Sequence, residues 1–358
     1  MPGGLCIGKG CVKVFSCFGK KAALSAALFA WRKGRGREMT EDMEKGSAYH
    51  ISEEHAAGSP LTESRDHGKG AFGSAFGAEQ RADDAESVRA YLIKEWEEAV
   101  GDTPEDAAPV AWEDIGGGLC RFCLSACPSR SGAELLADLF LLTVRGRVGQ
   151  RGREAYRPHY RLLRKEYAGY FPALLKVRGI LEEKGRAVVA IDGRCAGGKT
   201  HFAALIGRLF PCNVFHMDDF YLPMDMRPSD WTQIPGGNMD LVRFRTEVLA
   251  PAKAGESVTY RPYDCRKGEG GEARLLPYKP LTVVEGSYSH HPALADGYDL
   301  RIFLTCSRRE QTSRLHMREG GRFSAYEEMW VPMEENYFRY YAVEEGSDLV
   351  VDTTSFFD

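Results

Sequence analysis

The residues best suited to chemistry form a glycine-rich segment near the middle of the chain, Gly193-Arg194-Cys195-Ala196-Gly197-Gly198-Lys199-Thr200. This segment fits the pattern Gly-x-x-x-x-Gly-Lys-Thr, in which backbone N–H groups surround a phosphate chain and glycines let the backbone approach it. Lys199 would place its charge on the terminal phosphates, and the Thr200 hydroxyl would bind Mg²⁺. The segment therefore predicts the binding of a nucleoside triphosphate.

Two elements must hold this loop in place. An apolar run over residues 187–192 precedes it and predicts a strand. Phe202, Leu205, Ile206 and Leu209 follow it at helical spacing before Pro211, and they predict a helix that starts near Gly198. The alternative is a glycine-rich turn that binds nothing, but the strand-loop-helix context favours a phosphate site.

Strands and helices alternate along the rest of the chain. Further strands are predicted over residues 213–218, 281–285, 300–305 and 349–352, with a helix from about Asp240. Such alternation indicates an α/β fold with a parallel sheet that is covered by helices on both faces. Ligands of such sheets lie beyond the carboxyl ends of the strands, where the loop, Asp218 and Glu285 all fall.

Two acidic residues at predicted strand ends are candidates for catalysis and metal binding. Asp218 lies in the stretch HMDDFYLP, and as the last residue of its strand it could accept the proton of a substrate hydroxyl. Glu285 ends the run LTVVE and could hold or orient a Mg²⁺-bound water. The alternatives are a helix-capping or loop role for Asp218 and a carboxylate satisfied by local backbone for Glu285.

Several arginines follow the strand predicted over residues 300–305. They are Arg308, Arg309, Arg314, Arg318 and Arg322. One interpretation is a lid whose guanidinium groups meet the charge of the phosphoryl group during transfer. The other is a solvated basic face that pairs with Glu310 and Glu319.

Two further groups of residues could bind metal but lack a complete ligand set. Cys120, Cys123 and Cys127 could bind zinc or an iron–sulfur centre if a fourth ligand came from elsewhere, but incidental thiols are the favoured interpretation. For the His290-His291 pair a loop role is favoured over metal binding.

The N-terminal part of the chain differs in composition from the rest. Residues 1–40 hold eight Lys or Arg against one acid, whereas residues 41–115 hold nineteen acids against six bases. We expect a poorly ordered arm over residues 1–84 and a helical extension of unknown role over 85–159 with helices at 85–100 and 133–144. A third helix, over 160–183, would open a second domain at 160–358, which contains the glycine-rich loop.

Composition also bears on compartment and partners. Ten cysteines without framework spacing indicate free thiols and a cytoplasmic location. The apolar run over residues 22–30 is too short to span a bilayer, so no membrane partner is expected. The basic head lacks interleaved aromatic residues, so it predicts no specific nucleic-acid partner.

Over residues 160–352 the chain resembles the uridine kinase and phosphoribulokinase group of P-loop kinases, especially uridine-kinase-like proteins of anaerobic bacteria. The resemblance is carried by the glycine-rich loop, HMDDFYLP, PGGNMDLVRFRTEVLAP and VVEGSYSHHP. It implies that residues 160–358 form a P-loop kinase domain with the three-layer sandwich of P-loop NTPases. It also implies ATP or GTP with Mg²⁺ as phosphoryl donor and Asp218 as base. It also implies a lid formed by the segment 314–322, which contains Arg318. On the acceptor side it implies Tyr221, Arg243, Tyr263 and Asp264.

The chain departs from that group at three places. Gly197 replaces the usual Ser before Gly-Lys, His201 replaces a second Thr, and residues 236–240 replace a His-Pro-Asp loop that helps to hold the nucleoside. These changes affect the prediction of a pyrimidine acceptor more than the prediction of phosphate binding.

The sequence thus predicts a kinase that phosphorylates a hydroxyl of a small molecule, with uridine or cytidine as the first acceptors to test. One alternative is a kinase for another hydroxyl metabolite, such as a sugar phosphate or pantothenate. The other is a nucleotide-binding switch or scaffold without kinase activity. An oligomer is compatible with the sequence, which does not specify one.

Overall fold

The computed structural model describes residues 73–100, 112–123, 127, 129–144, 161–265 and 267–357. Residues 1–72 of the arm predicted over residues 1–84 lie outside the described residues, and so does the apolar run over residues 22–30. Within the described residues, no helix has both the length and the apolar character needed to cross a membrane.

A five-stranded parallel sheet forms the centre of the fold, in the order β12-β11-β4-β10-β5. Its strands are β4 (Ala187–Gly193), β5 (Cys212–His216), β10 (Leu281–Glu285), β11 (Leu300–Thr305) and β12 (Leu349–Asp352). β4 and β10 are buried along their whole length, as expected for strands covered on both faces. The predicted α/β fold with a parallel sheet is therefore confirmed, and so are its five strands.

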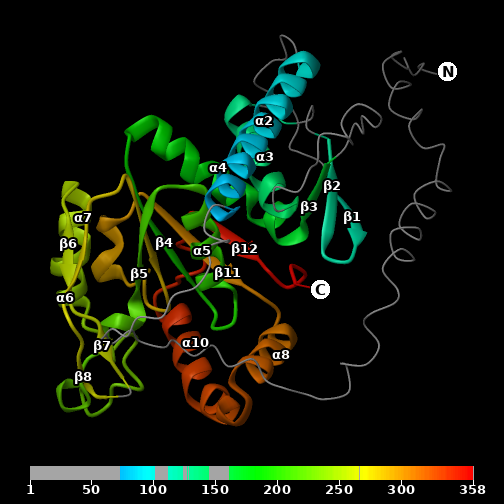
Figure 1. Ribbon diagram of the computed structural model, residues 1–358. Helices are drawn as coiled ribbons and strands as arrows, with labels where there is room; N and C mark the ends of the chain where they lie inside the picture. The colour runs from blue at the N-terminus through cyan, green and yellow to red at the C-terminus, as the bar shows by residue number, and fades with distance from the viewer. Residues whose placement is uncertain are drawn as a thin grey trace, which may run out of the picture. The chain divides into compact units, whose positions relative to one another are not determined.

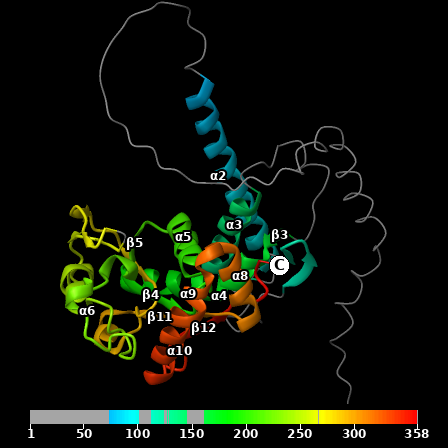
Figure 2. The same ribbon diagram turned by 90° about the horizontal axis from the view of Figure 1, so that it is seen from below.

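Helices cover both faces of this sheet (Figures 1 and 2). On β4 and β11, Val189 and Leu304 belong to one apolar cluster, whereas Val188 and Phe303 belong to the other. The first cluster includes α4 (Lys165–Lys184) and α5 (Lys199–Leu209). The second includes α6 (Leu241–Phe244), the π-helical turn Arg245–Leu249, α7 (Ala250–Ala254) and α10 (Val331–Tyr340). Alternation of side chains along each strand thus builds two cores.

Short elements complete this part of the fold. Between β11 and β12 lie α8 (Arg308–Glu319), the 3₁₀ turn Gly320–Arg322, α9 (Phe323–Ala325), the π-helical turn Tyr326–Trp330 and α10. Two small antiparallel pairs join β6 (Val258–Tyr260) to β9 (Arg274–Leu276) and β7 (Tyr263–Asp264) to β8 (Glu269–Gly270). Three further 3₁₀ turns lie at Met217–Phe220, Met224–Met226 and Pro292–Gly297.

The N-terminal extension contains strands as well as the predicted helices. α2 (Gly73–Val100) and α3 (Arg130–Val144) include the predicted helices, and a three-stranded antiparallel sheet is formed by β1 (Glu113–Gly116), β2 (Leu119–Phe122) and β3 (Arg161–Arg164). Because β3 pairs with β2, the third predicted helix begins at Lys165 and not at residue 160. The prediction of a purely helical extension was therefore incomplete.

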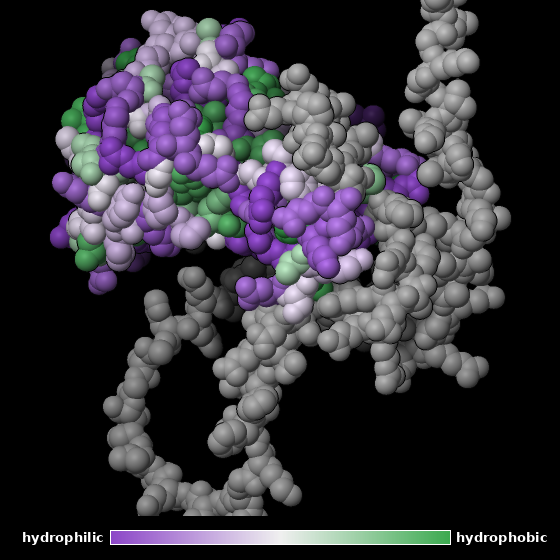
Figure 3. Space-filling model, turned by 90° about the horizontal axis from the view of Figure 1, so that it is seen from above, coloured by the Kyte–Doolittle hydropathy of each residue, from purple (hydrophilic) through white to green (hydrophobic). Residues whose placement is uncertain are grey.

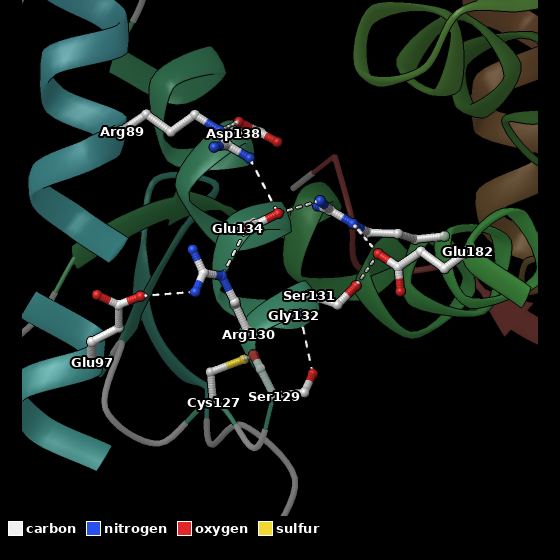
Figure 4. A network of polar contacts seen from close by, with 11 residues as sticks. Arg89, Glu97, Cys127, Ser129, Arg130, Ser131, Gly132, Glu134, Asp138 and Glu182 are labelled. Atoms are coloured by element: carbon white, nitrogen blue, oxygen red, sulfur yellow. Dashed lines mark hydrogen bonds and ion pairs between the residues drawn. The ribbon is translucent and has the colours of Figure 1, made fainter. Parts of the chain in front are cut away.

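Polar and apolar contacts join the extension to α4. The carboxylate of Glu134 on α3 lies 3.5 Å from Arg89 of α2, 3.3 Å from Arg130 and 2.6 Å from Arg178 of α4 (Figure 4). Leu92 and Leu136 pack in the same buried cluster as Leu174 of α4. The apolar core therefore continues across the boundary that the sequence predicted near residue 160.

Hydrophilic residues dominate the described surface in the view from above, with hydrophobic residues in smaller areas between them (Figure 3).

All seven cysteines that the structure describes have free thiols. Among these described residues, no three His, Cys, Asp or Glu side chains gather to hold a metal ion. Cys120 and Cys127 are buried, and Cys123 is exposed.

Candidate functional site

The glycine-rich loop lies between β4 and α5, where the sequence predicted it. Gly193, the last residue of β4, has φ 131°, and a Cβ there would lie 2.0 Å from the Leu304 carbonyl oxygen. Gly198 caps α5 with φ 96°, and a Cβ there would lie 3.0 Å from the Tyr170 hydroxyl. Glycine is needed at both positions because each combines a left-handed backbone with a close neighbour.

The loop opens into a cavity of about 800 Å³, which we call the central cavity. Its loop-side lining consists of Cys195, Ala196, Gly198, Lys199 and Thr200. The N-terminus of α5 therefore faces the cavity with its unpaired amides and its positive dipole end, a combination that favours a phosphate anion.

Lys199 is held at the edge of this cavity by two oxygen atoms. Its ammonium group donates to the Gly193 carbonyl oxygen at 2.6 Å and to the Ser287 hydroxyl at 3.3 Å. Ser287 follows β10 by two residues and lines the same cavity. The lysine is thus oriented before any phosphate is bound.

Thr200 and Glu285 provide oxygen ligands suited to a hard cation. The Thr200 hydroxyl donates to Glu285 Oε1 at 3.1 Å, and both residues line the cavity. Glu285 is buried at the end of β10, where His216 Nδ1 lies 2.5 Å from the same carboxylate oxygen. This hydrogen bond raises the pKa of His216 above its usual value. A carboxylate and a hydroxyl fit Mg²⁺, which binds through one or two carboxylates, phosphates and water.

Asp218 lies in the cavity, but in a different local structure from the one predicted. β5 ends at His216, and Asp218 belongs to the 3₁₀ turn that follows it, so the prediction that Asp218 is the last strand residue was wrong. Its carboxylate is reached by solvent from the cavity and accepts a hydrogen bond from the Tyr221 hydroxyl at 3.1 Å. Desolvation by the surrounding protein raises the pKa of Asp218, and the Tyr221 hydrogen bond opposes this increase. A carboxylate with a raised pKa is a stronger general base.

The arginines of α8 have separate roles. Arg318 lines the cavity, donates to Glu319 at 2.7 Å and stacks on Tyr326. Arg314 also lines it, but its guanidinium donates to the carbonyl oxygens of Ala196 at 3.3 Å and Thr353 at 2.7 Å. Arg314 therefore fixes the loop against the segment after β12, whereas Arg318 is the more accessible cation.

Among the described residues, three predicted site residues have side chains that do not line the central cavity. Arg194 forms ion pairs with Glu335 and Glu344 at 2.8 and 3.0 Å. Arg243 donates to the carbonyl oxygens of Arg261 and Asp219 at 2.6 and 3.2 Å. Asp264 accepts from the Lys267 amide within the β7–β8 hairpin, although its neighbour Tyr263 does line the cavity.

The histidine pair after β10 has structural partners. His290 is buried, and its ring nitrogens contact Ala190 O at 3.3 Å and Ser347 Oγ at 3.1 Å. Burial lowers the pKa of His290, so its neutral form is favoured. His291 accepts the Ala293 amide at the start of a 3₁₀ turn.

Glu334 of α10 lines the cavity and was missed by sequence reasoning. Its carboxylate accepts the Cys195 amide at 2.9 Å and a hydrogen bond from the Ser287 hydroxyl. Since that hydroxyl donates to Glu334, its oxygen faces Lys199. Glu334 thereby connects α10, the loop and the segment after β10. The stretch WVPMEENYF contains no pattern that could have revealed this role.

Asp192, the residue before the loop, was also missed as a site residue. It is fully buried and accepts hydrogen bonds from the Gly193 amide at 2.7 Å, the His290 amide at 2.9 Å and the Tyr337 hydroxyl at 2.9 Å. An acid inside an otherwise apolar strand was the one available signal.

No family model matches this chain, and no curated protein matches it. A solved structure of a possible uridine kinase from Bacillus stearothermophilus is 21% identical, with coverage of 49% of this chain and 95% of that chain and a TM-score of 0.39. D-glycerate 3-kinase from Cryptococcus neoformans is 14% identical, with coverage of 51% and 94% and a TM-score of 0.36. Similarities at this level do not identify a reaction.

Proposed function

We propose that this protein transfers the terminal phosphoryl group of ATP or GTP to a hydroxyl group of a small molecule. The observation that supports this proposal is that the loop, Lys199 and Asp218 line one cavity. Donor phosphates held by the loop would lie in the same space as a carboxylate able to accept a proton.

The mechanism would depend on positioning and charge. The loop amides and the α5 dipole bind the phosphates, and Lys199 moves from the Gly193 carbonyl to a terminal phosphate oxygen. Thr200 and Glu285 would hold Mg²⁺, which supplies charge neutralisation at the phosphate oxygens when it is bound. Asp218 accepts the proton of the acceptor hydroxyl, and Arg318 stabilises the charge on the transferred group.

The predicted acceptor is a pyrimidine nucleoside, and aromatic residues in the cavity are compatible with a planar base. Tyr221, Tyr263, Tyr326 and Trp330 line it. Other hydroxyl metabolites remain the alternative acceptors. A nucleotide-binding switch without kinase activity is less well supported, because such a protein would not need Asp218 in a position to act as base. The cytoplasmic location stays a prediction from the cysteines.

The test is ADP formation by the purified full chain with Mg-ATP and pooled hydroxyl metabolites, with mass detection of acceptors that gain one phosphoryl group. We expect Lys199→Ala to abolish turnover, and Asp218→Asn to lower turnover by at least about 100-fold while nucleotide binding persists. Lys176→Ala, on the exposed face of α4, is the control and should act as wild type. Full turnover by Lys199→Ala would exclude the proposal. ATP binding without any phosphorylated acceptor would favour the switch.

A further inference from the structure

One part of the lining of the central cavity consists mainly of aromatic and apolar groups, and we call it the acceptor region. It is formed by Tyr221, Met224, Arg227, Tyr263, Cys265 and Trp330. Apart from Asp218 at its border, Arg227 is the one charged side chain in this set. A cation in such surroundings requires a physical explanation.

The Arg227 guanidinium has a fixed orientation. Its Nε donates to the Leu222 carbonyl oxygen at 2.9 Å, and its Cζ lies over the rings of Trp231 and Tyr221, 4.7 and 5.8 Å from their centroids. Cation–π contacts of this kind hold a guanidinium without neutralising its charge. None of the described residues accepts a hydrogen bond from the terminal N–H groups of Arg227, which stay available to another partner.

Arg227 also differs from the other arginines near the cavity. Arg194, Arg243, Arg314 and Arg318 each lie within 3.5 Å of a carboxylate of this chain. Among the residues that the structure describes, none provides a carboxylate within 4.0 Å of Arg227. A half-buried, oriented and unneutralised guanidinium is the arrangement by which proteins bind carboxylates and phosphates in bidentate fashion.

One tyrosine relates this cation to the proposed base. The hydroxyl of Tyr221 donates to Asp218, while the ring of the same residue lies beneath Arg227. The charges of both residues also reach the Cys265 thiol, whose pKa is raised mainly by burial while Arg227 lowers it and Asp218 raises it. The base and the cation therefore line one cavity and contact the same tyrosine.

We propose that Arg227 binds an anionic group, carboxylate or phosphate, on the acceptor. Of the acceptors named above, this selects the anionic hydroxyl metabolites over the neutral nucleosides. This inference rests on the proposed kinase function. In the reaction, the bond from the terminal phosphorus to the bridging oxygen breaks and a bond to the acceptor oxygen forms. Asp218 takes the hydroxyl proton, and the nucleoside diphosphate leaves. Arg227 acts only in binding.

The first experiment compares acceptors in matched pairs with the full chain and Mg-ATP: ribose and ribose 5-phosphate, glycerol and glycerate, uridine and uridine monophosphate. We expect the anionic member of the productive pair to have a kcat/KM roughly 10- to 100-fold above the neutral one, the range expected for a charge-assisted hydrogen bond. The ribose and uridine pairs test a phosphate group on the acceptor, whereas the glycerol and glycerate pair tests a carboxylate. Equal or better use of the neutral members would overturn the inference and leave the kinase function intact.

The second experiment uses variants. Arg227→Gln should raise the KM for the anionic acceptor by roughly 10- to 100-fold, with the KM for ATP unchanged. Arg227→Lys, which keeps the charge without the planar fork, should have an intermediate effect. Arg261→Gln removes an exposed arginine near β6 and serves as the control. An unchanged acceptor KM in Arg227→Gln would contradict the proposal.

A binding measurement removes the dependence on turnover. With the loop saturated by a non-hydrolysable ATP analogue and Mg²⁺, inorganic phosphate or acetate is titrated while tryptophan fluorescence is recorded, because Trp231 stacks on Arg227. We expect saturable quenching by at least one anion in wild type and its loss in Arg227→Gln. Identical titrations of the two proteins would refute anion binding by Arg227, whether or not the protein is a kinase.

Discussion

Asp192 offers a strong test of how the loop is supported. Its fully buried carboxylate accepts three hydrogen bonds, from the Gly193 and His290 amides and the Tyr337 hydroxyl. Each hydrogen bond to a charged group contributes about 1.5–3 kcal/mol. Removal of the carboxylate also recovers part of its desolvation cost. We therefore expect Asp192→Ala to lower the free energy of unfolding by roughly 3–5 kcal/mol.

The assay is equilibrium urea unfolding followed by tryptophan fluorescence, with the m-value required to stay constant. Asp192→Asn keeps an acceptor of similar shape and should lose less, roughly 1–2 kcal/mol. The control is Asp225→Ala, an exposed acid in a 3₁₀ turn, for which a change within about 0.5 kcal/mol is expected. If Asp192→Ala lost less than about 1 kcal/mol, the three donors would not depend on this carboxylate.

Two further predictions concern the loop and the base. Gly193→Ala should destabilise the fold by at least about 3 kcal/mol in the same assay, because its Cβ would lie 2.0 Å from Leu304 O. Gly117→Ala, also at positive φ but with nothing within 4 Å, should cost only about 1 kcal/mol, and similar losses in the two variants would contradict the steric explanation. Because the folded protein raises the pKa of Asp218, the native state binds the carboxyl proton of Asp218 more tightly than the unfolded state does. The ionised Asp218 therefore destabilises the fold above that pKa, and stability is recovered as pH falls through it. Asp218→Asn should accordingly be more stable than wild type near pH 7–8, with the difference shrinking towards pH 4, and a difference independent of pH would argue against the raised pKa.

The sequence predicts the sheet and the loop well because both depend on local patterns. Parallel strands buried on both faces appear as apolar runs, such as Leu281–Glu285, and the loop requires glycine at Gly193 and Gly198 for backbone reasons. The short strands β1 and β2 lack this signal, since every residue of β1 is exposed. Their presence is decided by pairing, which a local pattern does not reveal.

The side-chain roles are less predictable because they depend on tertiary neighbours. Arg243 was predicted on the acceptor side from its motif, but two carbonyl oxygens and Asp240 occupy its guanidinium. Glu334 contacts the loop across more than a hundred residues of sequence. Arg227 lies within a polar segment, and the aromatic residues near it do not recur at a regular spacing that would have indicated its role. Only the three-dimensional arrangement distinguishes these residues from ordinary surface charges.

The attachments of α8 and α10 to the loop determine which part of the chain could move when nucleotide binds. Gln311 and Arg314 of α8 contact the carbonyl oxygens of Cys195 and Ala196, while Glu335 and Tyr337 of α10 contact Arg194 and Asp192. Both helices are thus anchored to the loop and should travel with it as one body. The segment between these helices that could fold over a bound nucleotide is then short, residues 320–330, with hinges at Gly320-Gly321 and at the π-helical turn before α10. Arg318 belongs to α8 and would keep its place beside the loop, whereas Tyr326 belongs to this segment, so a small rotation would move an aromatic ring across the cavity while the cation stays fixed.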